Sequence, residues 1–166
     1  MAQSERPAVQ RAQPPKGPYQ VVNGVMRWML SSPRRARRLG QSLLLLHLTG
    51  HKTGRVIDVP VAYTHVGGQL VVLTTSVWRV NLRGRPEVEV TLHGRRLGAR
   101  AVLVEHPDAV ARVYGARILE LGYAKAGRRM GIRINVDRLP THEELVEAAR
   151  RDQLSVVYLT LTGDGR

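Results

Sequence analysis

Five short apolar runs follow one another in the middle of the chain, with no helical pattern between them. Their spacing has the two-residue period of β-strands, and they span residues 43–48, 56–64, 70–75, 87–92 and 97–104. Gly67-Gly68 and His93-Gly94 stand between successive runs, where tight hairpin turns need residues that tolerate positive φ. Consecutive short strands joined by turns favour an antiparallel barrel or sandwich, because a parallel sheet would need helical crossovers.

Helical patterns flank this strand region. Apolar residues recur at helical spacing in residues 19–30 and 107–122, and Thr141 followed by Glu144 matches a capping box that opens a helix over residues 141–152. Residues 155–161 read as a last strand, whereas the basic stretch 123–138 reads as irregular. The sequence therefore predicts a mainly β (α+β) fold.

The first 17 residues carry several prolines among polar residues and lack the apolar core of a secretory signal. We expect residues 1–17 to be a disordered lead and residues 18–166 to form one domain of ordinary size. No run approaches the roughly 18 apolar residues that a membrane-spanning helix needs. A cytoplasmic protein is expected.

The amino-acid composition limits the partners and the catalytic groups that the chain can have. The chain has 26 Lys+Arg, 13 Asp+Glu and a formal net charge of +13, which favours polyanionic partners, although a GC-rich genome would also produce an arginine-rich chain. Cysteine is absent, which excludes disulfides, thiolate metal sites and a cysteine nucleophile. The six histidines form no HxH or HExxH pattern, so we expect no metal site.

A glycine-bracketed basic turn joins the first two strand runs. Gly50 and Gly54 permit a tight reversal, while Lys52 and Arg55 place cations beside any backbone amides that the turn leaves free. The pattern predicts an anion-binding hairpin. The alternative is a solvated hairpin tip in a basic protein.

A second candidate segment follows the third strand run. Trp78 offers a flat face to an aromatic ligand, while Thr74, Thr75 and Ser76 could hydrogen-bond the polar edge of such a ligand. Tryptophan is also common in protein cores, so a purely structural role for Trp78 stays open.

Taken in order, the segments 48–55, 59–61, 78–82 and 86–90 resemble a known family. This is the deazaflavin-dependent nitroreductase group of split-barrel oxidoreductases, which bind coenzyme F-420 and are distantly related to FMN-binding pyridoxamine-phosphate-oxidase-like barrels. The resemblance implies a split antiparallel β-barrel with flanking helices, coenzyme F-420 as cofactor with FMN as the alternative, and a homodimer.

The resemblance also implies roles for individual residues. The basic turn would bind the phosphate and acidic tail of the coenzyme, and the segment after the third strand would lie against its ring. Tyr123 matches a tyrosine that faces substrate and is the candidate catalytic residue. The candidate cofactor contacts are His51, Lys52, Thr53, Arg55, Pro60, Thr74, Thr75, Ser76, Trp78 and Asn81.

Three departures from the family pattern stand out. Family members usually carry arginine at the position of His51, so this contact would depend on pH. The link between Thr75 and Trp78 is shorter than usual, which would curtail the ring pocket. Residues 135–153 form an insertion before the last strand.

These observations predict a reductase that transfers hydride from reduced F-420 to a small-molecule substrate. The substrate would be a quinone-like, nitro or unsaturated organic acceptor. The alternative is a non-catalytic protein that binds a flavin, a tetrapyrrole or an apolar ligand on the same barrel. Aromatic residues make up only 4% of the chain and do not alternate with basic residues along the strands, which argues against nucleic acid as the partner. Peripheral contact with an anionic membrane stays open.

Overall fold

A computed structural model describes residues 6–12, 24, 32, 34 and 43–164. These residues fall into two compact units. Among the described residues, the barrel unit comprises 24, 32, 34, 43–72, 76–103 and 157–164, and the helical unit comprises 6–12, 73–75 and 104–156. The helix expected over residues 19–30 lies outside the described residues except for Gly24, and the single-domain assignment of residues 18–166 stays a prediction.

Seven strands form one sheet in the order β3-β2-β6-β7-β9-β5-β4. β2 pairs antiparallel with β3 and with β6, β6 pairs antiparallel with β7, and β4 with β5. The strands are β2 (Leu43–Thr49), β3 (Val56–Ala62), β4 (Thr64–Val66), β5 (Gln69–Thr74), β6 (Glu87–Leu92), β7 (Arg95–Val104) and β9 (Ser155–Asp164).

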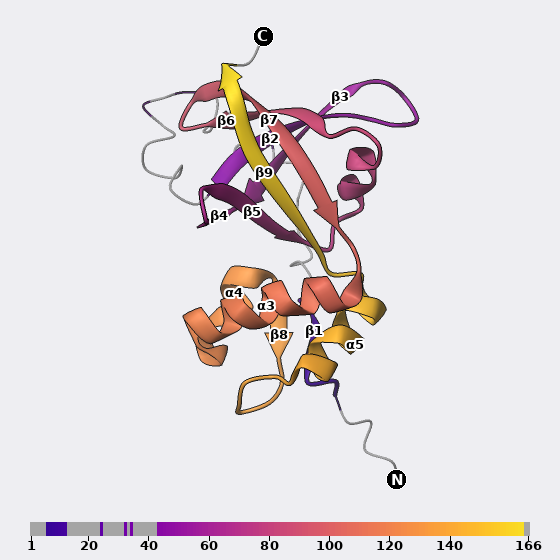
Figure 1. The fold of residues 1–166 in the computed structure, drawn as a ribbon, viewed down its shortest axis with the longest axis vertical. Coiled ribbons are helices and arrows are strands. Elements are labelled where there is room, and N and C mark those ends of the chain that lie inside the picture. Colours follow the sequence, from indigo (N-terminus) through magenta and orange to yellow (C-terminus); the bar gives the residue numbers. More distant parts are fainter. Residues whose placement is uncertain (1–5, 13–23, 25–31, 33, 35–42, 165–166) are drawn as a thin grey trace. The chain divides into compact units, whose positions relative to one another are not determined.

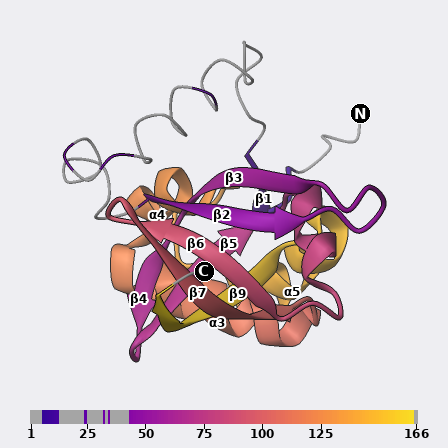
Figure 2. The same cartoon turned by 90° about the horizontal axis from the view of Figure 1, so that it is seen from above.

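The two ends of this strand order are neighbours in the chain. β3 ends at Ala62 and β4 begins at Thr64, so only Tyr63 separates the first strand of the order from the last. A flat sheet of seven strands could not place its two edges one residue apart, because adjacent strands lie about 4.8 Å apart. The sheet therefore curls on itself (Figure 1, Figure 2), which confirms the predicted split antiparallel β-barrel.

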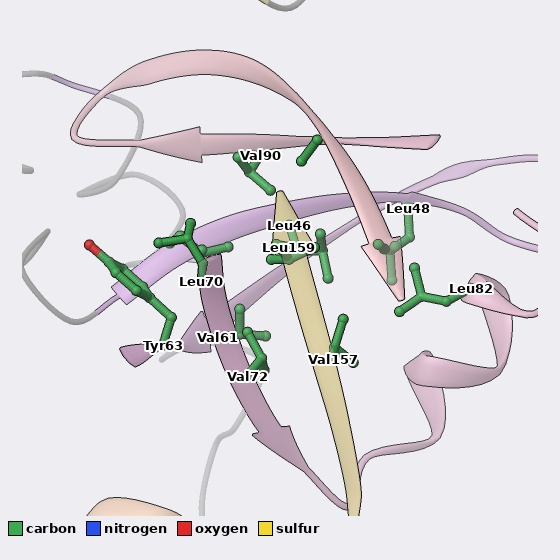
Figure 3. Packing of buried hydrophobic residues seen from close by; sticks show 13 residues of the cluster. Leu46, Leu48, Val61, Tyr63, Leu70, Val72, Leu82, Val90, Val157 and Leu159 are labelled. Atoms are coloured by element: carbon green, nitrogen blue, oxygen red, sulfur yellow. The ribbon is translucent and has the colours of Figure 1, made fainter. Parts of the chain in front are cut away.

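Alternating side chains fill the barrel. Along β7, Ala99 and Ala101 belong to the buried core, whereas Val102 is 49% exposed, as the two-residue period predicted. Figure 3 shows side chains from opposite strands and from the segment after β5 converging inside the barrel. The core comprises Leu44, Leu46, Leu48, Val61, Tyr63, Leu70, Val72, Leu82, Val90, Ala99, Ala101, Val157 and Leu159.

The hairpin turns adopt the conformation that their sequences predicted. Gly67 and Gly68 have φ of 54° and 81°, and His93 and Gly94 have φ of 51° and 78°. Two successive residues with positive φ make a type I′ turn, whose twist matches that of the flanking strands. Each pair therefore fixes the register of its hairpin.

The helical unit contains three helices, α3 (Pro107–Leu121), α4 (Tyr123–Met130) and α5 (His142–Asp152), and the two short strands β1 (Val9–Arg11) and β8 (Ile132–Ile134). The predicted capping box is present at α5. The Thr141 hydroxyl accepts from the Glu144 backbone N–H at 3.2 Å, and the Glu144 carboxylate accepts from the Thr141 N–H at 2.8 Å. No helix within the described residues is long and apolar enough to cross a membrane.

Two local expectations differ from the structure. Residues 9–11, part of the expected disordered lead, form β1, which pairs with β8 and buries Val9. Residues 123–130, expected to be irregular, form α4, which ends at Gly131 with φ of 66°. Both elements are short, and β1 in addition pairs with residues more than 120 positions away in β8, which a local pattern does not reveal.

Gly127 of α4 provides a test of this packing. A Cβ at this position would stand 2.9 Å from the backbone carbonyl oxygen of Ile132, which cannot move without displacing β8. We expect Gly127→Ala to lower the free energy of unfolding by about 1–3 kcal/mol, although alanine is the better helix former. Urea denaturation measures the change.

Gly115→Ala in α3 is the matched control. A Cβ there would meet only the end of the flexible Leu145 side chain, at 3.3 Å. This variant should stay within about 1 kcal/mol of the parent protein. Equal effects of the two substitutions would contradict the described packing of α4 against β8.

Candidate functional site

The turn between β2 and β3 is held by its own backbone. The Gly50 N–H donates to the Arg55 carbonyl at 2.8 Å, and the Gly54 N–H donates to the Gly50 carbonyl at 2.9 Å. Gly54 has φ of 67°, and a Cβ on Gly50 would approach the Thr53 hydroxyl to 3.0 Å. Both glycines are therefore needed for the turn, as the sequence predicted.

This turn leaves donors unused. The Arg55 N–H donates to the Thr53 hydroxyl at 3.3 Å, whereas the amides of Lys52 and Thr53 have no acceptor among the described residues. The side chains of Lys52 and Arg55 are exposed and pair with no carboxylate of the described chain. Two free amides and two unpaired cations fit an anionic group such as a phosphate or a carboxylate.

Asn81 ties the turn to the segment after β5, which forms the 3-10 helix η1 (Val77–Leu82). Its Oδ1 accepts from the His51 N–H at 2.9 Å and lies 2.9 Å from Nδ1 of the His51 ring. Its Nδ2 donates to the Trp78 carbonyl at 2.9 Å. Asn81 is only 8% exposed, so these bonds lie in partly buried surroundings and position the turn relative to η1.

The other side chains of η1 have mainly internal roles. Trp78 is partly buried and packs against the barrel core, which supports a structural role for at least part of its ring. Arg79 is 5% exposed and its Nη1 donates to the Ser76 carbonyl at 2.9 Å. The Ser76 hydroxyl does not cap η1.

A cavity of about 230 Å³ adjoins the turn. Arg85 lies in its wall, donates from Nη1 to the Thr49 carbonyl at 3.3 Å and pairs with no carboxylate of the described residues. Sequence reasoning missed Arg85 because a single arginine in an arginine-rich chain carries no distinguishing pattern. The cavity is lined by His47, Leu48, Thr49, Val56, Asn81, Arg85, Glu87, Val88, Glu89 and Arg96.

Both carboxylates in the cavity wall already pair with arginines. Glu89 pairs with Arg96, and Glu87 lies 3.5 Å from the guanidinium of Arg100. Arg85 therefore remains as a third cation near the turn, beside Lys52 and Arg55.

His47, in the wall of this cavity, links three strands. Its Nδ1 lies 2.7 Å from Asp58 of β3 and its Nε2 lies 2.7 Å from the Thr91 hydroxyl of β6. Both ring nitrogens are thus occupied, and the ring acts as a cross-strand tie. The described residues contain no group of three histidine, aspartate or glutamate side chains placed to hold a metal ion.

The remaining predicted site residues lie elsewhere. Pro60 of β3 stands opposite Leu45 of β2. Its neighbours in the chain are the core residue Val61 and Val59, which packs against the core, so Pro60 faces away from the core. Thr74, Thr75 and Tyr123 belong to the helical unit, with Tyr123 at the first position of α4. Their contribution to a site with the turn stays a prediction.

The fold described above is a split β-barrel, and the sequence identifies the family to which the chain belongs. Residues 25–154 match the profile of the family described as F420H(2)-dependent quinone reductase. The chain belongs to this family. Oxidoreductase chemistry that depends on coenzyme F-420 is the activity for which the family is named.

The chain is also similar to several solved structures. A protein described as a domain-swapped dimer is 17% identical, with 86% of this chain and 99% of that chain covered and a TM-score of 0.45. An F420 reductase is 14% identical (82% and 93% covered, TM-score 0.42). A pyridoxamine 5'-phosphate oxidase-related, FMN binding protein from Nostoc punctiforme is 14% identical (89% and 82% covered, TM-score 0.45).

Similarities at this level carry no conclusion about ligand or oligomeric state. No curated protein sequence matches the chain significantly.

Asn81 gives a stability test of the site. Asn81→Ala removes the hydrogen bonds to His51 and Trp78 and leaves a partly buried N–H and a partly buried carbonyl with one partner fewer. We expect the free energy of unfolding to fall by about 2 kcal/mol. Val77→Ala, on an η1 side chain that is 76% exposed, should change it by less than about 0.5 kcal/mol. Urea denaturation that shows no difference between the variants would refute the anchoring role.

Proposed function

We propose that this protein is a reductase that binds F-420 through the turn between Gly50 and Arg55 and reduces a quinone-like, nitro or unsaturated organic acceptor. Membership of the F420H(2)-dependent quinone reductase family supports the cofactor. The observation that carries the proposal is the set of unpaired donors on this turn. When bound, reduced F-420 supplies the hydride, so the protein has to bind and orient rather than provide a nucleophile.

The acidic end of the coenzyme is assigned to the turn. Lys52 and Arg55 contribute charge-assisted hydrogen bonds, and the amides of Lys52 and Thr53 contribute neutral ones. Arg85 adds positive potential from the neighbouring cavity. The same groups would also donate hydrogen bonds to the phosphate of FMN, so FMN is the alternative cofactor.

The ring end of the coenzyme is assigned to the segment that joins β5 to η1. Thr74, Thr75 and Ser76 would form hydrogen bonds with the polar edge of the ring. Trp78 would contact the ring with the part of its indole that does not pack against the core. Pro60 and Asn81 would support the site through the β2–β3 hairpin and η1. Tyr123 would orient the acceptor or give it a proton, which a phenol can do as a general acid.

A homodimer, a cytoplasmic location and peripheral contact with an anionic membrane stay predictions. The alternative function is non-catalytic binding of a flavin, a tetrapyrrole or an apolar ligand on the same barrel. Nothing in the described residues favours this alternative, and the binding experiment below separates it from the reductase.

Binding tests the proposal directly. Purified protein is titrated with oxidised F-420 and with FMN, and absorbance or fluorescence is followed. Lys52→Ala and Arg55→Ala should each weaken F-420 binding by about tenfold, since a hydrogen bond to a charged group contributes about 1.5 kcal/mol or more. Arg112→Ala changes another exposed arginine, which pairs with Asp108 in the helical unit, and should leave the affinity unchanged.

Cofactor selectivity and activity complete the test. Tighter binding of F-420 than of FMN, followed by oxidation of reduced F-420 when a benzoquinone is added, would support the reductase. If neither cofactor binds at micromolar protein, the reductase is wrong and the non-catalytic binding protein takes its place.

A further inference from the structure

The ring of His51 is oriented by Asn81, and the contacts fix its proton. Asn81 donates from Nδ2 to the Trp78 carbonyl, so its Oδ1 faces the turn, where it also accepts from the His51 backbone N–H. The His51 Nδ1 lies 2.9 Å from this same Oδ1. A carbonyl oxygen can only accept, so Nδ1 must carry the proton and donate it.

The neutral ring of His51 therefore has its lone pair on Nε2. Nε2 has no partner among the described residues, and the residue is exposed at the tip of the turn. At neutral charge, Nε2 can only accept a hydrogen bond, which suits a ligand hydroxyl and repels an anionic oxygen. Once protonated, the same nitrogen donates and the ring becomes a cation.

We propose that His51 is the specificity-determining residue that makes anion binding at this turn depend on proton uptake. The inference rests on the proposed function of the turn as an anion site and goes beyond it. It predicts which protonation state binds anions and which atom carries the proton. An arginine or lysine at this position would lack the effect, because its charge does not change near neutral pH.

Several cationic groups lie around His51. They are Lys52 and Arg55 of the same turn, Arg79 of η1, and Arg85, which donates to the carbonyl of Thr49 at the end of β2. Beyond Asn81, the cavity wall holds the further charged or titratable groups His47, Glu87, Glu89 and Arg96. His47 has both ring nitrogens bonded, and Glu87 and Glu89 are paired with arginines.

The coupling between proton uptake and anion binding sets how strongly the affinity depends on pH. An anion that bonds the protonated ring favours proton uptake, so its affinity rises as pH falls. The affinity should change by up to tenfold per pH unit over the range where the free ring loses its proton and the complex retains it. Above that range, binding depends on Lys52, Arg55 and the two free amides alone.

Two measurements test the inference. Nitrogen NMR of the free protein at about pH 8.5, where an ordinary histidine is neutral, reports the tautomer of His51 without any ligand. Affinities for oxidised F-420 and for inorganic pyrophosphate are then measured from about pH 5.5 to about pH 8.5. The parent protein is compared with His51→Gln, with His51→Arg and with the control His106→Gln, an exposed histidine of the helical unit.

We expect an Nδ1–H tautomer and a parent affinity that rises toward acid pH, with the same slope in His106→Gln. The slope should be smaller in His51→Gln and in His51→Arg than in the parent, because only the ligand's own titration remains there, and His51→Arg should bind more tightly than the parent at about pH 8.5. An Nε2–H tautomer, or an equal slope in the parent and in His51→Gln, would overturn the inference. Pyrophosphate binding with the expected slope, together with no F-420 binding, would refute the proposed function and leave this inference standing.

Discussion

The one-residue connection between β3 and β4 is the constraint on which the barrel depends. Tyr63 alone separates two strands that stand at opposite ends of the seven-strand order, so the sheet has to close on itself. Closure brings the end of β2 and the segment after β5 to the same end of the barrel, where Leu48 and Leu82 enter the core together (Figure 3). The turn that follows β2 is thereby placed within hydrogen-bonding distance of η1.

Asn81 forms hydrogen bonds that hold the turn and η1 together. By accepting from His51, it satisfies one amide of the turn, while the glycine-dependent bonds satisfy two others. The amides of Lys52 and Thr53 are left over on the same tip as two unpaired cations. The proposed site therefore consists of the donors that the fold itself does not use.

The sequence predicts most of the barrel because the information is local. Two-residue alternation and the Gly67-Gly68 turn place β2, β5, β6 and β7 to within about two residues, and the glycines and cations of residues 50–55 mark the proposed anion site. The run expected over residues 56–64 divides into β3 and β4 at Tyr63, and the last strand extends to Asp164 instead of ending at residue 161. The pairing of β1 with β8 and the ties made by His47 escape such reasoning, since they join distant residues of ordinary type. Asn81 became a candidate through family resemblance alone, and its bond to a residue 30 positions away emerges only in the structure.

The central claim, that the free donors of the turn bind the acidic end of F-420, is tested most directly by backbone amide NMR during titration with the oxidised coenzyme. The largest shifts should fall on the amides of Lys52 and Thr53. The amides of Gly50 and Gly54, already bonded within the turn, should move less. Saturable F-420 binding with no shift at Lys52 or Thr53 would contradict the account.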